Sequence, residues 1–155
     1  MEVQYCFIRE GYFTEHSSFI NMLDVGQTKK QSNRVHLCIS VKEDENRYVI
    51  PLRNNLGNPV RKFGRIGHAV PSASRKNAGL DFRYTLIVND DKYIEIPDER
   101  KIPRSQARRI EAEFDTIVTE FLQYLKGYKK AVKKRRVHRE PLYRVSSLQN
   151  YELNN

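Results

Sequence analysis

The segment RVHLCISVKEDENRYVIPLRN, residues 34–54, determines the expected fold. Apolar residues occupy every second position from Val35 to Val41, which is the period of a half-buried β-strand. The charged residues 42–46 have the composition of a turn. Residues 47–52 then return as a second strand, with Pro51 at its edge or end. The segment therefore predicts an antiparallel hairpin.

Further elements are expected on both sides of this hairpin. Residues 3–9 read as a first strand, and Thr14 or Ser17 caps a short helix that is followed by a polar loop at 27–33. Two more strands, 84–88 and 92–96, are expected to pair with each other. After Pro103, apolar residues recur at helical spacing as far as Leu125, and Gly127 is expected to break or end that helix. Residues 142–145 are expected as a last strand and 147–153 as a short helical turn.

This order of elements predicts an α+β fold in one domain, residues 1–155. The expected architecture is a compact, strongly curved antiparallel β-sheet with a short N-terminal helix and a long C-terminal helix packed against it. The two cysteines, Cys6 and Cys38, fall in predicted strands and are expected to be buried free thiols.

The charge of the chain indicates its partners. The 155 residues carry a formal net charge of +9 and give a pI of about 9.6. Such a balance favours nucleic acid, an anionic membrane surface or an acidic protein as the partner. No apolar run is long enough to span a bilayer, and the first residues lack the pattern of a signal peptide. A cytoplasmic protein is therefore expected.

The most basic stretch before the C-terminal region is the segment 51–84, which is expected to be a long irregular loop up to about Asp81. It holds seven Lys/Arg, one His and a single acidic residue. Long loops of this kind are usually functional or disordered, and this one has the composition of a polyanion-binding surface. With one carboxylate in the loop, a two-metal site is not expected, and the chain has no phosphate-binding glycine loop, nucleophile elbow or HExxH motif. No metal and no cofactor are predicted.

RNA cleavage is chemistry that such a surface can perform, because RNA carries its own nucleophile in the 2′-hydroxyl. The protein has to align that hydroxyl with the adjacent phosphorus, remove a proton and neutralise the charge that builds on the phosphoryl oxygens. Arginine supplies charge but is a poor base, whereas lysine and histidine titrate more usefully.

Four residues are candidates for the scissile phosphate. His68 either transfers a proton or contacts phosphate, or else is a half-packed loop histidine. Arg53 follows the strand end and is expected to bind phosphate, while Asn54 either donates to a phosphate oxygen or shapes the turn. Antiparallel pairing brings Arg34 to the same end of the sheet as Arg53, although a pairing of Arg34 with the acids at 42–46 is the alternative.

Other side chains are expected to bind flanking parts of an RNA. The candidates are basic or aromatic and lie in or near the loop: Lys29, Lys30, Lys62, Arg65, Arg75, Lys76, Arg83 and Tyr84. Asp81 is expected to orient a neighbouring residue or cap a turn and not to act as a base. The run 129–139, with seven basic residues, is either a solvated face or a phosphate-tracking surface.

Three short motifs resemble a known family. Ile50-Pro51-Leu52-Arg53, Gly79-Leu80-Asp81-Phe82 and the ending at 146–151 are similar to the ToxN/AbiQ superfamily, the endoribonuclease toxins of type III toxin–antitoxin systems, and most like its TenpN branch. This chain departs from the pattern at 53–56, where the lysine that follows the Pro-Leu turn in these toxins is missing. Arg53, Lys62 or His68 would then take its charge-stabilising part, and Arg34 matches the basic residue that precedes the strand.

The resemblance implies a Kid/MazF-like barrel and metal-independent RNA cleavage that leaves 2′,3′-cyclic phosphate and 5′-hydroxyl ends. It also implies inhibition by a small repetitive RNA antitoxin that forms pseudoknots, assembly into a toxin–RNA hetero-oligomer, and phage defence by abortive infection. The residues by themselves leave two alternatives open: a non-catalytic RNA-binding module and a basic surface that recognises an acidic protein.

Overall fold

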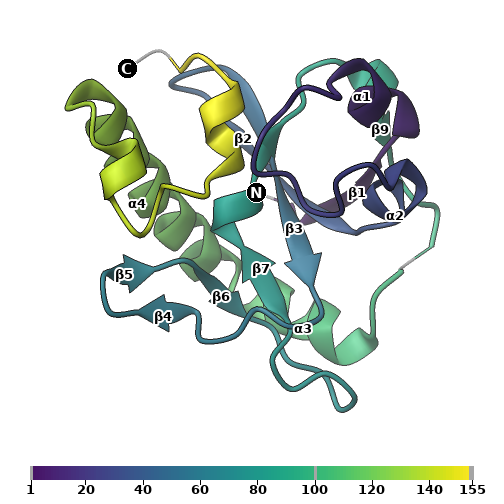
Figure 1. Ribbon diagram of the computed structural model, residues 1–155. Coiled ribbons are helices and arrows are strands. Elements are labelled where there is room, and N and C mark those ends of the chain that lie inside the picture. The colour runs from purple at the N-terminus through teal and green to yellow at the C-terminus, as the bar shows by residue number, and fades with distance from the viewer. Residues whose placement is uncertain (1, 100, 154–155) are drawn as a thin grey trace.

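A computed structural model describes residues 2–99 and 101–153, and its central element is an antiparallel sheet (Figure 1). The strands follow the spatial order β6-β7-β3-β2-β1-β9, and β8 pairs with β3 outside this path. A separate two-stranded hairpin is formed by β4 and β5. The strands are β1 (Gln4–Ile8), β2 (His36–Val41), β3 (Asn46–Arg53), β4 (Val60–Arg61), β5 (Gly64–Arg65), β6 (Gly67–Ala69), β7 (Gly79–Asp81), β8 (Leu86–Ile87) and β9 (Ile94–Glu95).

The hairpin predicted from the alternating pattern is confirmed. Strands β2 and β3 pair antiparallel from Val41 opposite Asn46 to His36 opposite Pro51. Glu45 takes a positive φ of 59° in the connecting turn, which lets the chain reverse tightly. Strand β3 then pairs with β8 near its beginning and with β7 near its end, so its last residues are held by two neighbours.

Each face of the sheet carries its own apolar core. On one face Tyr48 and Ile50 pack with Phe121 and other side chains of α4 (Phe114–Lys133). On the opposite face Val49 packs with Cys6 and with two aromatic residues of α1 (Glu10–Glu15). The successive residues of β3 alternate between the two cores, as the period of a strand requires.

In the part of the chain that the structure describes, four α-helices complete the fold: α1, α2 (Thr28–Ser32), α3 (Arg104–Ala112) and α4. The same residues form four short 3-10 helices: η1 (Phe82–Tyr84), η2 (Asp91–Tyr93), η3 (Val137–Arg139) and η4 (Ser147–Asn150). Among the helices of the described residues, none has the length and apolarity needed to cross a membrane. The α+β class and the antiparallel sheet are as predicted, but the sheet does not close into a barrel. Its path ends at β6 on one side and at the two-residue strand β9 on the other.

The N-terminal helix was expected in the wrong place. Residues 17–27 form turns, with positive φ at Asn21, Asp24 and Gly26, and helices form on either side of them. The side-chain amide of Asn150 bonds both the N–H and the carbonyl of Ile20, each at 2.8 Å. A contact across 130 residues thus satisfies backbone groups that a helix would otherwise pair. The polar loop expected at 27–33 is replaced by α2.

Three further expectations are wrong. The segment 51–84 is not a single irregular loop, because it contains the short strands β4 to β7. Strand β9 pairs with β1 and not with the strand before it. Residues 142–145 form turns, and their Tyr143 ring packs into the core beside α4.

Gly127 lies inside α4 and does not end it. A Cβ atom at this position would collide with the hydroxyl of Tyr143 and lie 3.1 Å from its Cζ. The glycine therefore makes room for a side chain that arrives from the C-terminal segment. Cys6 and Cys38 are free, as expected, but only Cys6 is buried, whereas Cys38 is partly exposed. Their sulfur atoms lie 2.9 Å apart between β1 and β2.

Candidate nucleic-acid interface

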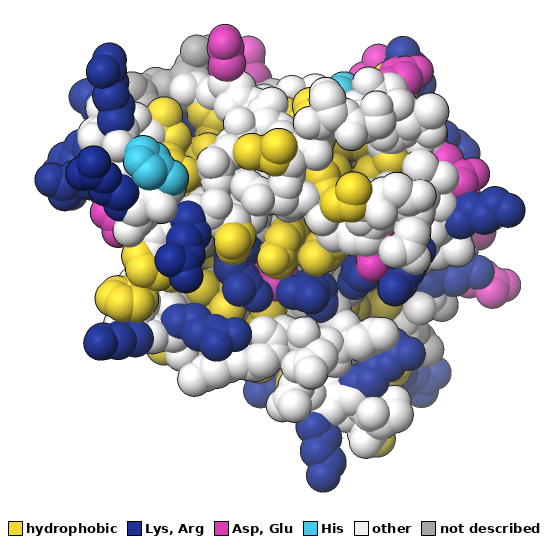
Figure 2. Space-filling model, in the orientation of Figure 1, with side chains coloured by type: hydrophobic (Ala, Val, Ile, Leu, Met, Phe, Trp, Pro, Cys, Tyr) yellow, Lys and Arg dark blue, Asp and Glu magenta, His cyan; other side chains and the backbone are white. Residues whose placement is uncertain are grey.

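A basic pocket of about 310 Å³ opens where β3 ends. Cationic side chains from four separate segments line it, and no carboxylate is among its lining residues. Figure 2 shows Lys and Arg side chains in a band across the middle of one face of the molecule. The lining residues are Lys30, Asn33, Arg34, Val35, Leu52, Arg53, Asn54, Arg75, Lys101, Ile102, Pro103 and Gln106. Five residues predicted from the sequence thus share one pocket.

Arg53 is held in place by a buried carboxylate. Its Nη1 donates to Oδ2 of Asp81 at 2.9 Å, and Asp81 is completely buried. Arg83 donates to the same carboxylate from Nε at 3.0 Å and from Nη2 at 2.9 Å. Two guanidinium groups are therefore fixed beside each other by one shared acceptor.

The ring of Tyr84 lies beside both arginines. The guanidinium carbons of Arg53 and Arg83 are 5.2 and 5.4 Å from its centroid, within cation–π range. Tyr84 is the last residue of η1. Asp81 caps η1 by accepting a hydrogen bond from the backbone N–H of Arg83. The expected role of Asp81 in orienting a neighbour and capping a turn is confirmed.

Arg34 is anchored at the same end of the sheet. Its Nη2 donates to Asp24 at 2.8 Å and its Nη1 to the carbonyl of Leu52 at 3.4 Å. The proximity of Arg34 to Arg53 is confirmed, and the alternative pairing with residues 42–46 is wrong. Burial raises the pKa of the Asp24 carboxyl, but hydrogen bonds and charge from Arg34 and Lys30 outweigh it and leave that pKa below its ordinary value.

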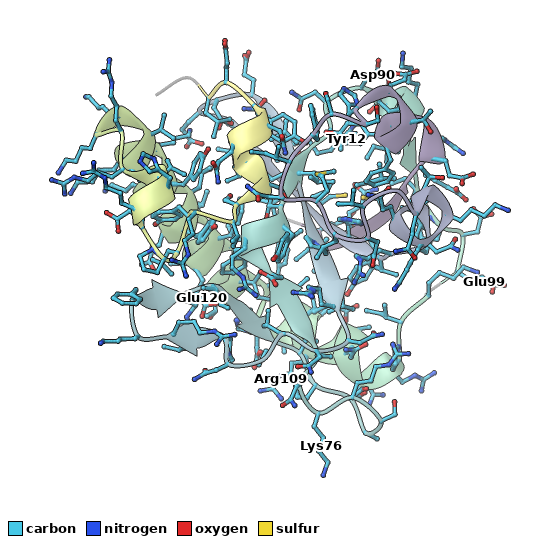
Figure 3. The ribbon with its side chains drawn as sticks, in the orientation of Figure 1. Tyr12, Lys76, Asp90, Glu99, Arg109 and Glu120 are labelled. Atoms are coloured by element: carbon cyan, nitrogen blue, oxygen red, sulfur yellow. The ribbon has the colours of Figure 1, made fainter. Side chains whose placement is uncertain are left out.

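Asn54 and Arg75 form a polar contact at the rim of the pocket. The Nη1 atom of Arg75 donates to Oδ1 of Asn54 at 2.6 Å. Lys30 lies 3.3 Å from Asp24, while Lys29 on α2 is exposed. Lys76 lies at the tip of the loop between β6 and β7 and points away from the rest of the molecule (Figure 3).

The structure does not bring His68 into this pocket. Both of its ring nitrogens contact carboxylates, Nδ1 with Glu120 at 2.8 Å and Nε2 with Glu113 at 2.8 Å. The hydrogen bond from His68 is the main cause of a lowered pKa of Glu113. Arg65 also reaches Glu120 of α4, at 3.4 Å. Lys62 lies on the β4–β5 hairpin, outside the pocket.

Several residues at the site have no clear signal in the sequence. Lys101 and Gln106 line the pocket from the segment around α3, and Asp24 comes from the turns before α2. His36 lies in an adjacent cavity of about 20 Å³ that Arg34 and Tyr84 also line. Burial lowers the pKa of His36 to about 4. The alternating pattern of β2 predicted that His36 lies on one face of the strand. The sequence does not show which of the two apolar cores covers that face.

No protein-family model matches the chain, and no curated protein matches it. A solved structure that it resembles is described as showing, for bacterial type III toxin–antitoxin systems, selective toxin inhibition by a non-coding RNA pseudoknot. The two share 12% identity and a TM-score of 0.48 over 86% of this chain and 75% of the other. Since this likeness is weak, function has to be inferred from the side chains described above.

Proposed function

We propose that this chain is a metal-independent endoribonuclease toxin of a type III toxin–antitoxin system. Its substrate is RNA, cut to 2′,3′-cyclic phosphate and 5′-hydroxyl ends, and its inhibitor is a small repetitive RNA that folds into a pseudoknot. The same basic pocket binds the substrate and the antitoxin. The antitoxin RNA and the protein together form a toxin–RNA hetero-oligomer. Phage defence by abortive infection is the biological role that goes with this class.

The observation that carries the proposal is the pocket at the end of β3. Among the described residues, five cationic side chains and no carboxylate line it, so its potential favours a chain of phosphates. The residues that resemble the toxin motifs, at 50–53 and 79–82, are the same residues that position Arg53 beside this pocket.

The arginines are suited to stabilise a transition state. Asp81 accepts a hydrogen bond from Arg53, and Asp24 accepts one from Arg34. Both guanidinium groups are therefore oriented before RNA binds. A guanidinium has five N–H donors, and preorganised donors stabilise phosphoryl charge without reorganising during the reaction. We assign Arg34 and Arg53 to the phosphoryl oxygens and Asn54 to positioning the ribose-phosphate backbone.

The remaining candidate residues have other roles in the proposed function. Arg75 and Lys30 bind the flanking phosphates at the pocket, and Arg83 and Tyr84 support Arg53. His68 holds β6 in position, because its two ring nitrogens contact Glu113 and Glu120 on the opposite side of the sheet. Proton transfer by His68 is the alternative to this role, and the variants in the Discussion test it.

A non-catalytic RNA-binding module is the second candidate. It is favoured by one observation: the charged side chains that line the pocket are all lysines and arginines. Such groups bind phosphate but are protonated near neutral pH and poor at removing a proton from a 2′-hydroxyl.

The two candidates are separated by incubating the purified chain with bacterial transcripts in buffer containing EDTA. The toxin is expected to cut RNA at defined positions. Its products should accept phosphate directly at their 5′ ends from polynucleotide kinase, because those ends carry hydroxyls.

A pseudoknot-forming repeat RNA added in excess should suppress the cleavage. RNA that is bound but left intact would support the binding module and overturn the proposed activity. Cleavage that stops in EDTA and returns with Mg²⁺ would contradict the metal-independent mechanism.

A further inference from the structure

The β4–β5 hairpin presents an exposed aromatic ring among positive charges. Its turn consists of Lys62 and Phe63, and the Phe63 side chain is 57% exposed. Arg61 precedes the turn and Arg65 follows it, while the ammonium of Lys62 lies 5.6 Å from the centroid of the Phe63 ring. Phe63 belongs to neither apolar core of the described residues. A phenylalanine at the tip of a hairpin adds nothing to that packing, and its ring is open to a ligand.

The hairpin lies against the segment that follows the basic end of α4. Gly64, next in the chain after Phe63, faces Leu142 so closely that a Cβ would lie 3.1 Å from its Cδ1. Leu142 follows the run of Lys and Arg that ends α4 and forms η3. In Figure 1 the hairpin lies below this end of the helix, and Figure 2 shows Lys and Arg side chains along the same edge, above and below.

These cations are not neutralised within the described residues. No ion pair joins any of them to an acidic side chain in the ranges 2–99 and 101–153. They are Arg61, Lys62, Lys133, Lys134, Arg135, Arg136 and Arg139, and all seven are exposed. Their charge is therefore available to an external polyanion.

We infer that this edge, the β4–β5 hairpin with the basic end of α4, is a second RNA-contact surface that holds unpaired nucleotides by stacking a base on Phe63. The inference deepens the proposed function and rests on it. Single-stranded nucleic acids are bound by positive grooves that follow the backbone and by aromatic side chains on which bases stack. A duplex keeps its bases stacked inside the helix, so an exposed ring selects for single strands. An acidic protein would satisfy the charges but gives no role to the ring.

The second surface is distinct from the pocket at the end of β3. None of the hairpin residues 60–65 lines that pocket. The hairpin precedes β6 in the chain, and its Arg65 reaches Glu120 of α4 at 3.4 Å. An RNA that enters the pocket and also reaches Phe63 therefore has to span both surfaces, which adds contacts that a short oligonucleotide cannot make.

The chain contains no tryptophan, which allows a direct test. Phe63→Trp introduces a single indole at the hairpin tip, and its fluorescence is quenched when a base stacks on it. The probe is a 2′-O-methyl oligouridine long enough to span both surfaces, which cannot be cut because its 2′-oxygens are blocked. The matched control is Ile96→Trp, at a position that is 50% exposed and directly follows β9, at the opposite end of the sheet path from β6.

We expect the single strand to quench the Phe63→Trp variant strongly and a duplex of equal length to quench it little. Quenching by the single strand should be much weaker at position 96. Phe63→Ala should weaken binding of the single strand by about fivefold to 150-fold, as stacked aromatic residues typically do. Replacing Arg61 and Lys62 together by alanine should lower the slope of log K against log salt by about 1.4, since each single-strand phosphate contact contributes about 0.7.

Equal quenching at positions 63 and 96, or wild-type affinity of Phe63→Ala, would overturn the inference. These outcomes are distinguishable from failure of the proposed function. If Phe63→Ala leaves binding unchanged while the wild-type chain still cuts RNA in EDTA, the second surface is wrong and the enzyme stands. If the stacking signal is present but no RNA is cut, the surface stands and the enzyme does not.

Discussion

The side chains of Arg53 and His68 lie on opposite faces of one sheet. His68 is opposite Leu80, and Leu80 is opposite Leu52, so these three side chains point toward α4. Arg53 is the next residue along β3 and points the other way, toward Asp81. The two residues that the sequence suggested for one scissile phosphate are therefore separated by the thickness of the sheet.

Replacement of Arg53 tests the proposed site. Arg53→Ala should lower the rate of RNA cleavage by roughly 10²–10³-fold, the loss typical when a preorganised donor to a developing negative charge is removed. The fold should persist, because Asp81 keeps its hydrogen bonds to Arg83 when Arg53 is removed. Rates of cleavage of a defined transcript, with circular dichroism as the check on folding, measure this effect.

Arg9→Ala serves as the matched control for this experiment. Arg9 is an exposed arginine that pairs with Glu95 at 3.6 Å, away from the pocket. Its variant should cleave RNA at the rate of the unmodified chain. In parallel, His68→Gln should cost far less activity than Arg53→Ala. A larger loss at His68 would restore proton transfer by that histidine as the better hypothesis.

The buried carboxylate of Asp81 is predicted to stabilise the fold. Asp81→Asn removes the charge between Arg53 and Arg83 and leaves two guanidiniums beside a neutral amide. Breaking a buried ion pair typically costs about 3–5 kcal/mol, and we expect a loss of about 3 kcal/mol because the amide oxygen still accepts a hydrogen bond. Urea denaturation followed by circular dichroism measures the change in unfolding free energy.

Asp91→Asn is the comparison for this substitution. Asp91 also pairs with an arginine, Arg47, at 2.8 Å, but its side chain is 89% exposed. Because exposed ion pairs contribute little, this variant should unfold at nearly the same urea concentration as the unmodified chain. Equal losses for Asp81 and Asp91 would show that burial does not matter here.

His36 is predicted to make stability depend on pH. Burial lowers its pKa to about 4 in the folded chain, whereas an unfolded histidine titrates near 6.5. Between these values the unfolded chain binds a proton that the folded chain does not, so stability decreases as the pH falls from about 6.5 to about 4. The contribution of this residue over that interval is about 3 kcal/mol.

Urea denaturation at a series of pH values between 4 and 7 measures this dependence. A His36→Gln variant cannot titrate in this range, so its unfolding free energy should change less with pH, whatever its absolute stability. An identical pH dependence in both proteins would contradict the assignment to His36.

Gly127 is predicted to be required by packing and not by backbone conformation. Alanine at an exposed helix position would normally stabilise a helix by about 1 kcal/mol relative to glycine. Here the added methyl collides with Tyr143, and such overpacking typically costs about 1–3 kcal/mol. Gly127→Ala should therefore lower the urea midpoint of unfolding.

Tyr143→Phe tests the cause of this effect. The hydroxyl of Tyr143 is the atom that a methyl at position 127 meets first. The double variant should consequently lose less stability than the sum of the two single variants. Additive losses would show that the two positions do not interact.

The sequence by itself determined the β2–β3 hairpin, the helical character of the region after Pro103 and the basic character of the segment 51–84. Each of these follows from a local pattern: strict alternation, helical spacing or charge density. Alternation also brought Arg34 and Arg53 to one end of the sheet, because antiparallel pairing relates their positions directly.

The tertiary structure alone decided which face each site residue occupies. Short strands such as β6 and β7 have too few residues to show a period, so the separation of His68 from Arg53 was not visible in the sequence. Likewise, the contacts of Gly127 with Tyr143 and of Ile20 with Asn150 join residues distant in the chain. Local propensity cannot predict such contacts, because their free energy comes from burial and hydrogen bonding that exist only once the chain has folded.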